Sequence, residues 1–223
     1  MAGKMQRRTR VKICGIGRLE DATVAVNNGV DALGFIFFAK SPRNILPEDA
    51  AEIIAGIPLF VDKVGVFVDA PQERVVEYAQ GGLTCIQLHG TESVEYCTKL
   101  REHLPFCQII KAFRVSEESI STHFEPYNIC VDAFLLDTYI QGAKGGTGLV
   151  FDWSIVPKLR LRRPVILAGG LSLENIAEAI SAVRPYAVDI NSGVEDGPGI
   201  KNHDKIKKIL RVVQSADVRM PVM

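Results

Sequence analysis

The chain has 223 residues, of which 47% are hydrophobic and 23% are charged, values typical of a globular protein with a sizeable core. Its 26 basic and 26 acidic residues balance, so nothing in the composition indicates a nucleic-acid partner. No stretch approaches the roughly 20 apolar residues of a membrane-spanning helix, and the N-terminal residues lack the apolar core of a signal peptide.

Short apolar or β-branched runs alternate with helix-like stretches along the chain. We expect strands at residues 11–14, 32–37, 63–68, 85–88, 108–113, 133–136, 165–168 and 187–190. We expect helices at about residues 19–28, 47–55, 71–79, 91–103, from 116 onward, 152–159, 172–182 and 203–213, with Asp152 as the N-cap of the sixth. Strands that alternate with helices predict a parallel sheet.

Eight strand-helix units at this length favour a single-domain α/β fold, the closed (β/α)8 TIM barrel, over an open sheet. We expect the barrel at residues 11–213, between a solvated basic N-terminal tail at 1–10 and a frayed C-terminal tail at 214–223. In such barrels the active site lies at the carboxyl ends of the strands.

The five cysteines are odd in number and form no CxxC pair: Cys14, Cys85, Cys97, Cys107 and Cys130. This spacing argues against a disulfide framework and against a zinc site. We therefore expect reduced thiols in a cytoplasmic protein that binds no metal.

Two reactive groups end strands of the expected barrel and would open onto one mouth. Cys14 ends the first strand, although a buried cysteine is equally compatible with packing alone. Asp137 ends the sixth strand, where apolar neighbours would raise its pKa and suit it to act as an acid, although it also suits a turn. As a thiolate base, Cys14 would need its pKa lowered by a nearby cation or a helix N-terminus.

Glycine-rich turns close the last two strands. They contain Gly169, Gly170, Ser192 and Gly193. Glycine lets backbone N–H groups approach an anion, and the loops after strands seven and eight of this fold commonly bind a phosphate. Each turn alone is compatible with an ordinary tight turn, but together they predict a phosphate site. The segment 145–148, which includes Gly146, is either a linker or the edge of a lid over that phosphate.

Four further polar residues follow strands. Arg43 is either a clamp for a substrate carboxylate or a surface arginine. His89 is either a ligand contact or a structural donor, and Asp189 either binds a sugar hydroxyl or anchors its turn. Asp69, before Pro71, is expected to be a turn residue.

These residues together resemble the phosphoribosylanthranilate isomerase family of tryptophan biosynthesis. The matching stretches run in order along the chain: Val11–Gly15, Leu33–Phe37, Ser41–Arg43, Val64–Val68, Gln87–Gly90, Leu135–Asp137, Gly145–Gly148, Phe151–Trp153, Leu167–Leu171 and Asp189–Glu195. They cover every expected strand end but the fifth. Two positions depart from the family pattern. Gly17 stands where the family usually continues after Gly15 with a Leu-Thr or Ile-Thr pair, and Asn191 stands where serine is common.

The resemblance implies the third step from chorismate. In this step N-(5-phosphoribosyl)anthranilate rearranges to 1-(2-carboxyphenylamino)-1-deoxyribulose 5-phosphate, an Amadori rearrangement that uses no cofactor. The resemblance assigns the general acid to Asp137, the general base to Cys14 and the anthranilate contact to Arg43. It assigns phosphate binding to the glycine-rich loops. It also implies a monomer or a homodimer, because the family includes both.

Two alternatives follow from the same residues. A related isomerase of the histidine pathway catalyses the same type of rearrangement, but its family uses a pair of aspartates and binds two phosphates. Here the first strand ends in Cys14 and one phosphate site is evident. A sugar-phosphate sensor without catalysis would not need both Cys14 and Asp137.

Overall fold

Eight parallel strands form a closed barrel in the computed structural model, which describes residues 8–116, 118–138 and 152–219. Each strand pairs with the next, and the last closes the barrel against the first. The strands are β1 (Arg10–Ile13), β2 (Ala32–Ile36), β3 (Asp62–Phe67), β4 (Cys85–Leu88), β5 (Gln108–Arg114), β6 (Ala133–Asp137), β7 (Val165–Ala168) and β8 (Ala187–Ile190). The expected (β/α)8 barrel is therefore confirmed.

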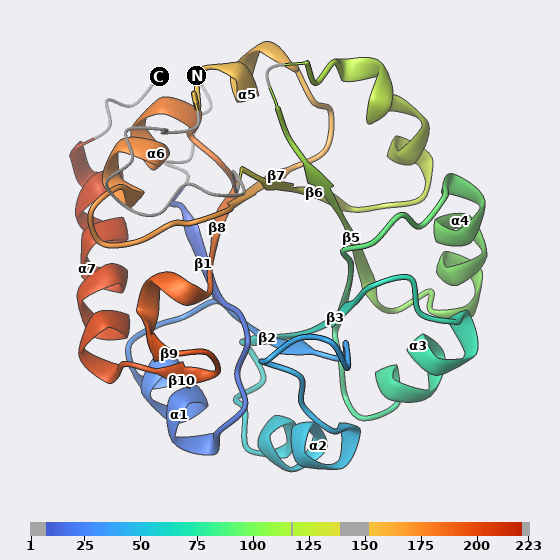
Figure 1. Ribbon diagram of the computed structural model, residues 1–223, viewed down its shortest axis with the longest axis horizontal. Helices are drawn as coiled ribbons and strands as arrows, with labels where there is room; N and C mark the ends of the chain where they lie inside the picture. Colours follow the sequence, from blue (N-terminus) through green and yellow to red (C-terminus); the bar gives the residue numbers. More distant parts are fainter. Residues whose placement is uncertain (1–7, 117, 139–151, 220–223) are drawn as a thin grey trace, which may run out of the picture.

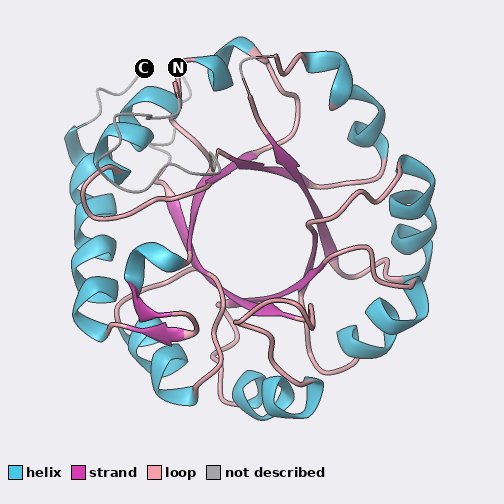
Figure 2. Ribbon diagram, in the orientation of Figure 1, coloured by secondary structure: helices cyan, strands magenta, loops and turns pink. Residues whose placement is uncertain are grey.

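Helices surround the barrel as an outer ring (Figures 1 and 2). They are α1 (Leu19–Asn27), α2 (Pro47–Ala55), α3 (Gln72–Ala79), α4 (Val94–His103), α5 (Ile155–Lys158), α6 (Ile176–Val183) and α7 (His203–Arg219). Short 3-10 helices are η1 (Ser121–His123), η2 (Glu125–Ile129) and η3 (Ser192–Val194). None of the helices in the described ranges is long and apolar enough to cross a membrane.

The helical layer departs from the expectation in several units. After β5, η1 and η2 replace the expected α-helix, because Pro126 lacks a backbone donor and weak helix formers such as Ser119, Ser121 and Thr122 precede it. Asp152 is not an N-cap: its Oδ1 accepts a 2.9 Å bond from the Ser154 backbone, and α5 begins only at Ile155. α4 likewise begins later than expected, at Val94, and α6 begins at Ile176, after a turn that includes Asn175.

A small antiparallel hairpin follows β8 and was not expected from the sequence. It consists of β9 (Glu195–Gly197) and β10 (Ile200–Lys201), with Lys201 paired opposite Glu195. In Figure 1 the hairpin lies beside η3, between the barrel and the outer ring of helices. It therefore stands next to the carboxyl end of β8.

Side chains alternate along the strands between two apolar layers. One layer packs against the helices and includes Ile13, Phe35 and Leu136. The other consists only of strand residues, mostly small ones: Val64, Cys85, Ile110, Ala112, Ala133, Leu135, Ile166, Ala168 and Ala187. Because alternate residues of a strand point to opposite faces, this second layer fills the barrel interior.

The two ends of the described chain are bound to each other. The backbone N and the Oγ1 of Thr9 each donate a 2.7 Å bond to the carboxylate of Asp217 in α7. Arg8 forms an ion pair with Asp31, and Arg10 already belongs to β1. Residues 8–10 are thus attached to the barrel rather than part of a solvated tail, and α7 continues beyond the expected end at Val213 to Arg219.

The loops after β7 and β8 are in close contact at the rim. A Cβ atom on Gly193 would lie only 2.0 Å from the backbone oxygen of Leu171. Thr138, after β6, donates 2.9 Å and 3.2 Å bonds to the backbone oxygens of Ala168 and Gly169. The carboxyl ends of β6, β7 and β8 are therefore tied together.

Gly193→Ala should destabilise the protein, because the added methyl group would collide with backbone that cannot move aside without opening the rim. We expect a loss of about 1–3 kcal/mol in the free energy of unfolding, measured by urea denaturation. Gly17→Ala is the matched control, because nothing lies within 4 Å of the methyl group it would add. Equal stability of the two variants would contradict the close contact.

Candidate active site

Cys14 lies directly after β1 and is almost fully buried, with 4% of its surface exposed. Its backbone N donates a 2.9 Å bond to Ile190 at the end of β8. A Cβ atom on Gly34 of β2 would lie 2.8 Å from the Cys14 sulfur, so glycine there leaves the space that the thiol occupies. The thiol is thus held between β1, β2 and β8.

An ion pair inside the barrel lies beneath this thiol. Lys12 Nζ donates a 2.8 Å bond to Asp189 Oδ2, and both side chains are buried. Burial alone would lower the pKa of Lys12, but Asp189 and Cys14 outweigh it and raise that pKa. The other oxygen, Asp189 Oδ1, is also buried and has no hydrogen-bond partner among the described residues, which is unusual for a buried carboxylate oxygen.

Burial and positive charge act on the Cys14 thiol in opposite directions. Burial raises the pKa of Cys14, and the charge of Asp189 adds to this effect. Lys12 and Lys201 lower it, but the net shift is upward. The cations expected near Cys14 are therefore present, whereas the lowered pKa that we expected for a thiolate is not found.

Asp137 ends β6, where the alternation along the strand directs its side chain toward the barrel interior. His89 Nε2 lies 3.5 Å from Asp137 Oδ2. The other ring nitrogen, Nδ1, is 3.0 Å from Nε2 of the buried Gln87. A Gln87 amide that donates to Nδ1 leaves the ring proton on Nε2, which faces the carboxylate. The structure thus brings Asp137 and His89 together.

Arg43 is ion-paired to the hairpin that follows β8, beside the end of β1, which lies between β2 and β8 in the barrel. Its guanidinium donates to both carboxylate oxygens of Glu195, at 2.6–3.1 Å. Glu195 in turn contacts Lys201 Nζ at 2.7 Å. Burial alone would raise the pKa of Glu195, but the two cations outweigh it and lower that pKa. Arg43 is therefore a fixed, partly buried side chain and not a free surface arginine.

The glycine-rich turns form a second part of the rim. Gly169 and Gly170 both have positive φ, 95° and 68°, which favours glycine at these positions. Asn175 closes their turn by donating to the Gly170 backbone oxygen at 3.0 Å and accepting from the Ser172 backbone at 2.9 Å. Ser192 belongs to η3. Gly146 lies outside the described residues.

Asp69 serves as the turn residue that the sequence predicts. Its Oδ1 accepts bonds from the backbone N and Oγ1 of Thr91, at 2.6 Å and 3.0 Å. Glu92 nearby is buried and paired with Lys111 at 3.0 Å. These contacts support the turn that carries His89 and belong to the scaffold of the site.

Several polar residues complete the site but were not expected there from the sequence: Lys12, Gln87, Glu195 and Lys201. Lys12 and Gln87 each interrupt a short apolar strand, and that interruption is the signal that would have found them. Glu195 and Lys201 carry no comparable signal, because the hairpin between them was not foreseen. Among the described residues, no cluster of three or more histidine, cysteine or acidic side chains could hold a metal ion.

Residues 11–212 match the sequence model of the family described as N-(5'phosphoribosyl)anthranilate (PRA) isomerase. The chain belongs to this family. Its members are enzymes of tryptophan biosynthesis, which decides against the sensor and against the histidine-pathway isomerase. The isomerase of Geotalea uraniireducens is 45% identical over 204 residues, which cover 91% of this chain and 97% of that protein.

Two solved isomerase structures are similar throughout their length. One is a complex with reduced 1-(o-carboxyphenylamino)-1-deoxyribulose 5-phosphate, with a TM-score of 0.82, 42% identity and coverage of 93% of this chain and 99% of that one. The other is a monomeric form generated from the dimeric Thermotoga maritima isomerase, with a TM-score of 0.80, 41% identity and coverage of 92% and 98%.

Lys12→Met should destabilise this isomerase strongly, because it leaves the Asp189 carboxylate buried without its partner. We expect a loss of about 3–5 kcal/mol in the free energy of unfolding, measured by urea denaturation. Lys99→Met is the control: it removes an exposed partner of Glu95 on α4 and should leave stability almost unchanged. Similar losses in both variants would contradict a special contribution from the buried pair.

Proposed function

We propose that this chain isomerises N-(5-phosphoribosyl)anthranilate to 1-(2-carboxyphenylamino)-1-deoxyribulose 5-phosphate in the cytoplasm, with Asp137 as general acid and Cys14 as general base. The observation that carries the proposal is that one barrel rim of a family member has a buried thiol beside two cations and an aspartate beside a histidine. Such a reaction needs no cofactor, because electrons move only between two carbons of the substrate.

The reaction begins at the ribose ring. Asp137 donates a proton to the ring oxygen, the bond from that oxygen to C1′ breaks, and a protonated Schiff base forms. His89, 3.5 Å from Asp137, is placed to orient the carboxyl group for this transfer. General acid catalysis of this kind contributes on the order of 10²–10⁴-fold to a rate.

The second proton transfer takes place at C2′. Cys14 removes the C2′ proton, and the electrons of that bond neutralise the Schiff base to give an enolamine. The enolamine gains a proton at C1′ and loses the one on the C2′ hydroxyl, which yields the ketone. Lys12 and Lys201 favour the thiolate form that this step needs, against the opposing effect of burial. We assign one ribose hydroxyl to Asp189, whose buried Oδ1 lacks a hydrogen-bond partner among the described residues.

The two charged ends of the substrate would bind at different parts of the rim. We assign the phosphate to the loops that carry Gly169, Gly170, Ser192 and Gly193, and to Gly146 in the segment outside the described residues. The close contact between the loops after β7 and β8 supports this assignment. We assign the anthranilate carboxylate to Arg43, whose partner Glu195 holds only part of its guanidinium.

Replacement of either proposed catalytic group should abolish most of the turnover while leaving the fold intact. We expect Cys14→Ala and Asp137→Asn each to reduce kcat by about 10²–10⁴-fold in a coupled fluorescence assay on phosphoribosylanthranilate. Cys107→Ala is the control, because this buried thiol lies before β5, at the amino ends of the strands, where it donates to the Leu83 backbone oxygen, and it should keep wild-type turnover. Near wild-type kcat in both active-site variants would exclude the mechanism.

A homodimer is the assembly that we propose, formed between the amino ends of two barrels. Leu59, Phe60 and Phe106 lie in loops that enter β3 and β5 and are 82%, 94% and 97% exposed. Aromatic side chains so exposed are typical of a surface that contacts a partner. The second copy is favoured as that partner because a 41%-identical relative is described as dimeric.

Charged substitutions in these loops should therefore give a monomer. We expect Phe60→Asp with Phe106→Asp to halve the mass measured by sedimentation equilibrium, because a buried carboxylate opposes association. Val218→Asp, at an exposed apolar position of α7, should leave the mass unchanged. A monomeric wild-type protein would disprove the assembly without affecting the catalytic proposal.

A further inference from the structure

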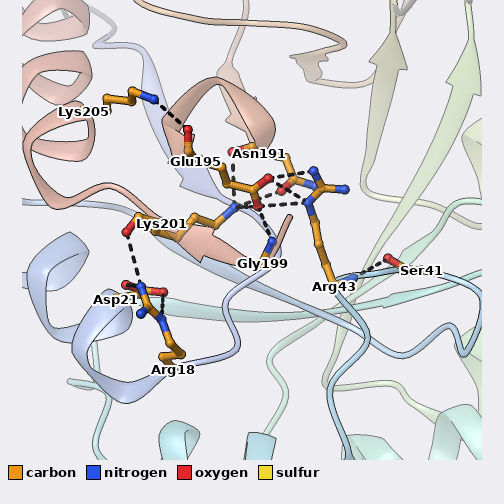
Figure 3. A network of polar contacts seen from close by, with 9 residues as sticks. All are labelled: Arg18, Asp21, Ser41, Arg43, Asn191, Glu195, Gly199, Lys201 and Lys205. Carbon is orange, nitrogen blue, oxygen red and sulfur yellow. Dashed lines mark hydrogen bonds and ion pairs between the residues drawn. The ribbon is translucent and has the colours of Figure 1, made fainter. Parts of the chain in front are cut away.

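A buried cluster of charges lies beside the proposed catalytic groups, and of its members only Lys201 has entered the proton transfers described above, through its charge. It consists of Arg43, after β2, and of Glu195 and Lys201 on the β9–β10 hairpin (Figure 3). The side chain of Glu195 is 4% exposed and that of Lys201 is completely buried. A buried charge is costly unless it has partners, so this arrangement needs an explanation beyond surface solubility.

Only part of the Arg43 guanidinium is used within the cluster. Nε lies 2.9 Å and 3.1 Å from the two Glu195 oxygens, and Nη2 lies 2.6 Å from Oε2. No described residue accepts a hydrogen bond from Nη1, and Figure 3 shows one terminal nitrogen directed away from Glu195. A guanidinium offers five donors in a fixed fork, so the remaining edge can still bind a second carboxylate.

Lys201 holds Glu195 in place. Its Nζ contacts Glu195 Oε1 at 2.7 Å and Asn191 Oδ1 at 2.9 Å, and the backbone N of Gly199 donates to Glu195 Oε1 at 3.2 Å. The positive charge of Lys201 also offsets the negative charge of Glu195. Arg43 can therefore be oriented by a carboxylate without losing its attraction for an anionic ligand.

The cluster touches the segment that carries the thiol. A Cβ atom on Gly15, the residue after Cys14, would lie 2.8 Å from Asn191 Oδ1 and 3.0 Å from Cδ of Arg43. Any ligand held by the free edge of Arg43 is thus fixed relative to the end of β1. A shift of this guanidinium would move the ligand relative to the base.

We propose that Glu195 and Lys201 are positioning residues for the aromatic carboxylate of the substrate, with Lys201 fixing Glu195 and Glu195 aiming the free edge of Arg43 at that carboxylate. This inference rests on the proposed function, because it assumes that Arg43 binds the anthranilate end. It assigns to the hairpin a role in substrate recognition. If the hairpin served only to cover the barrel, substitutions in it would affect substrates with and without a carboxylate equally.

The test compares two substrates, made by condensing ribose 5-phosphate with anthranilate or with aniline, which lacks the carboxylate. For Glu195→Gln we expect KM for the anthranilate compound to rise about ten- to a hundredfold, because one or two charge-assisted hydrogen bonds to the substrate are lost. We expect kcat for this compound to change less than about threefold. KM for the aniline compound should equal that of the wild type. The same substitution added to Arg43→Ala should cause no further rise in KM.

Asp196→Asn is the matched control, because it removes an exposed carboxylate of the same hairpin that is paired with Lys205. It should leave both KM values unchanged. Should Glu195→Gln fail to fold, Glu195→Gln combined with Lys201→Met removes both charges of the buried pair. It should show the same selective rise in KM, whereas kcat should fall for both compounds because Lys201 no longer favours the Cys14 thiolate.

An equal rise in KM for both substrates in these variants would overturn the positioning role and leave the hairpin a purely structural one. Unchanged KM for the anthranilate compound would also overturn it. Absence of wild-type turnover on the anthranilate compound is a different outcome, because it would refute the proposed function itself.

Discussion

The closure of β1 against β8 is the constraint on which the rest of the site depends. Four residues of β1 pair in register with four of β8, from Arg10 opposite Ala187 to Ile13 opposite Ile190. Inside the barrel the buried pair of Lys12 and Asp189 joins the same two strands. This seam sets Cys14 at the level of the loop after β8, so that groups from the two ends of the chain meet around one sulfur.

Charge around that sulfur is arranged in two layers. Beneath it, Lys12 and Asp189 are nearly neutral as a pair, and beside it the hairpin adds Lys201. Burial makes the thiol hold its proton more tightly, while the two lysines make proton loss easier. The basicity of Cys14 is therefore a balance between opposing effects, and small changes in solvent access at the rim would alter it more than they would alter the fold.

The strand pattern could be predicted from the sequence because each strand is a short apolar run bounded by turn residues. Three of the eight strands match their expected bounds, including Cys85–Leu88, and the others differ by one residue at an end or at both. The helical layer was less predictable. The segments that contain Pro126 and Pro157 were expected to form α-helices, but they form only a 3-10 helix and a four-residue α-helix, respectively. Cys14 and Asp137 could be proposed from the sequence because strand ends converge in a barrel. Glu195 and Lys201 could not, since their meeting with Arg43 depends on a hairpin and on contacts across more than 150 positions of the chain.

The bond between Thr9 and Asp217 has a consequence for the connectivity of the fold. This contact already holds the two ends of the described chain together. The barrel should therefore also form if the chain ends were placed elsewhere than between α7 and β1. A short linker could join these ends, and new termini could be opened in an exposed loop such as the one at residues 80–82, before β4. A circularly permuted chain, in which the eight units follow one another from a different starting point, should thus form the same barrel.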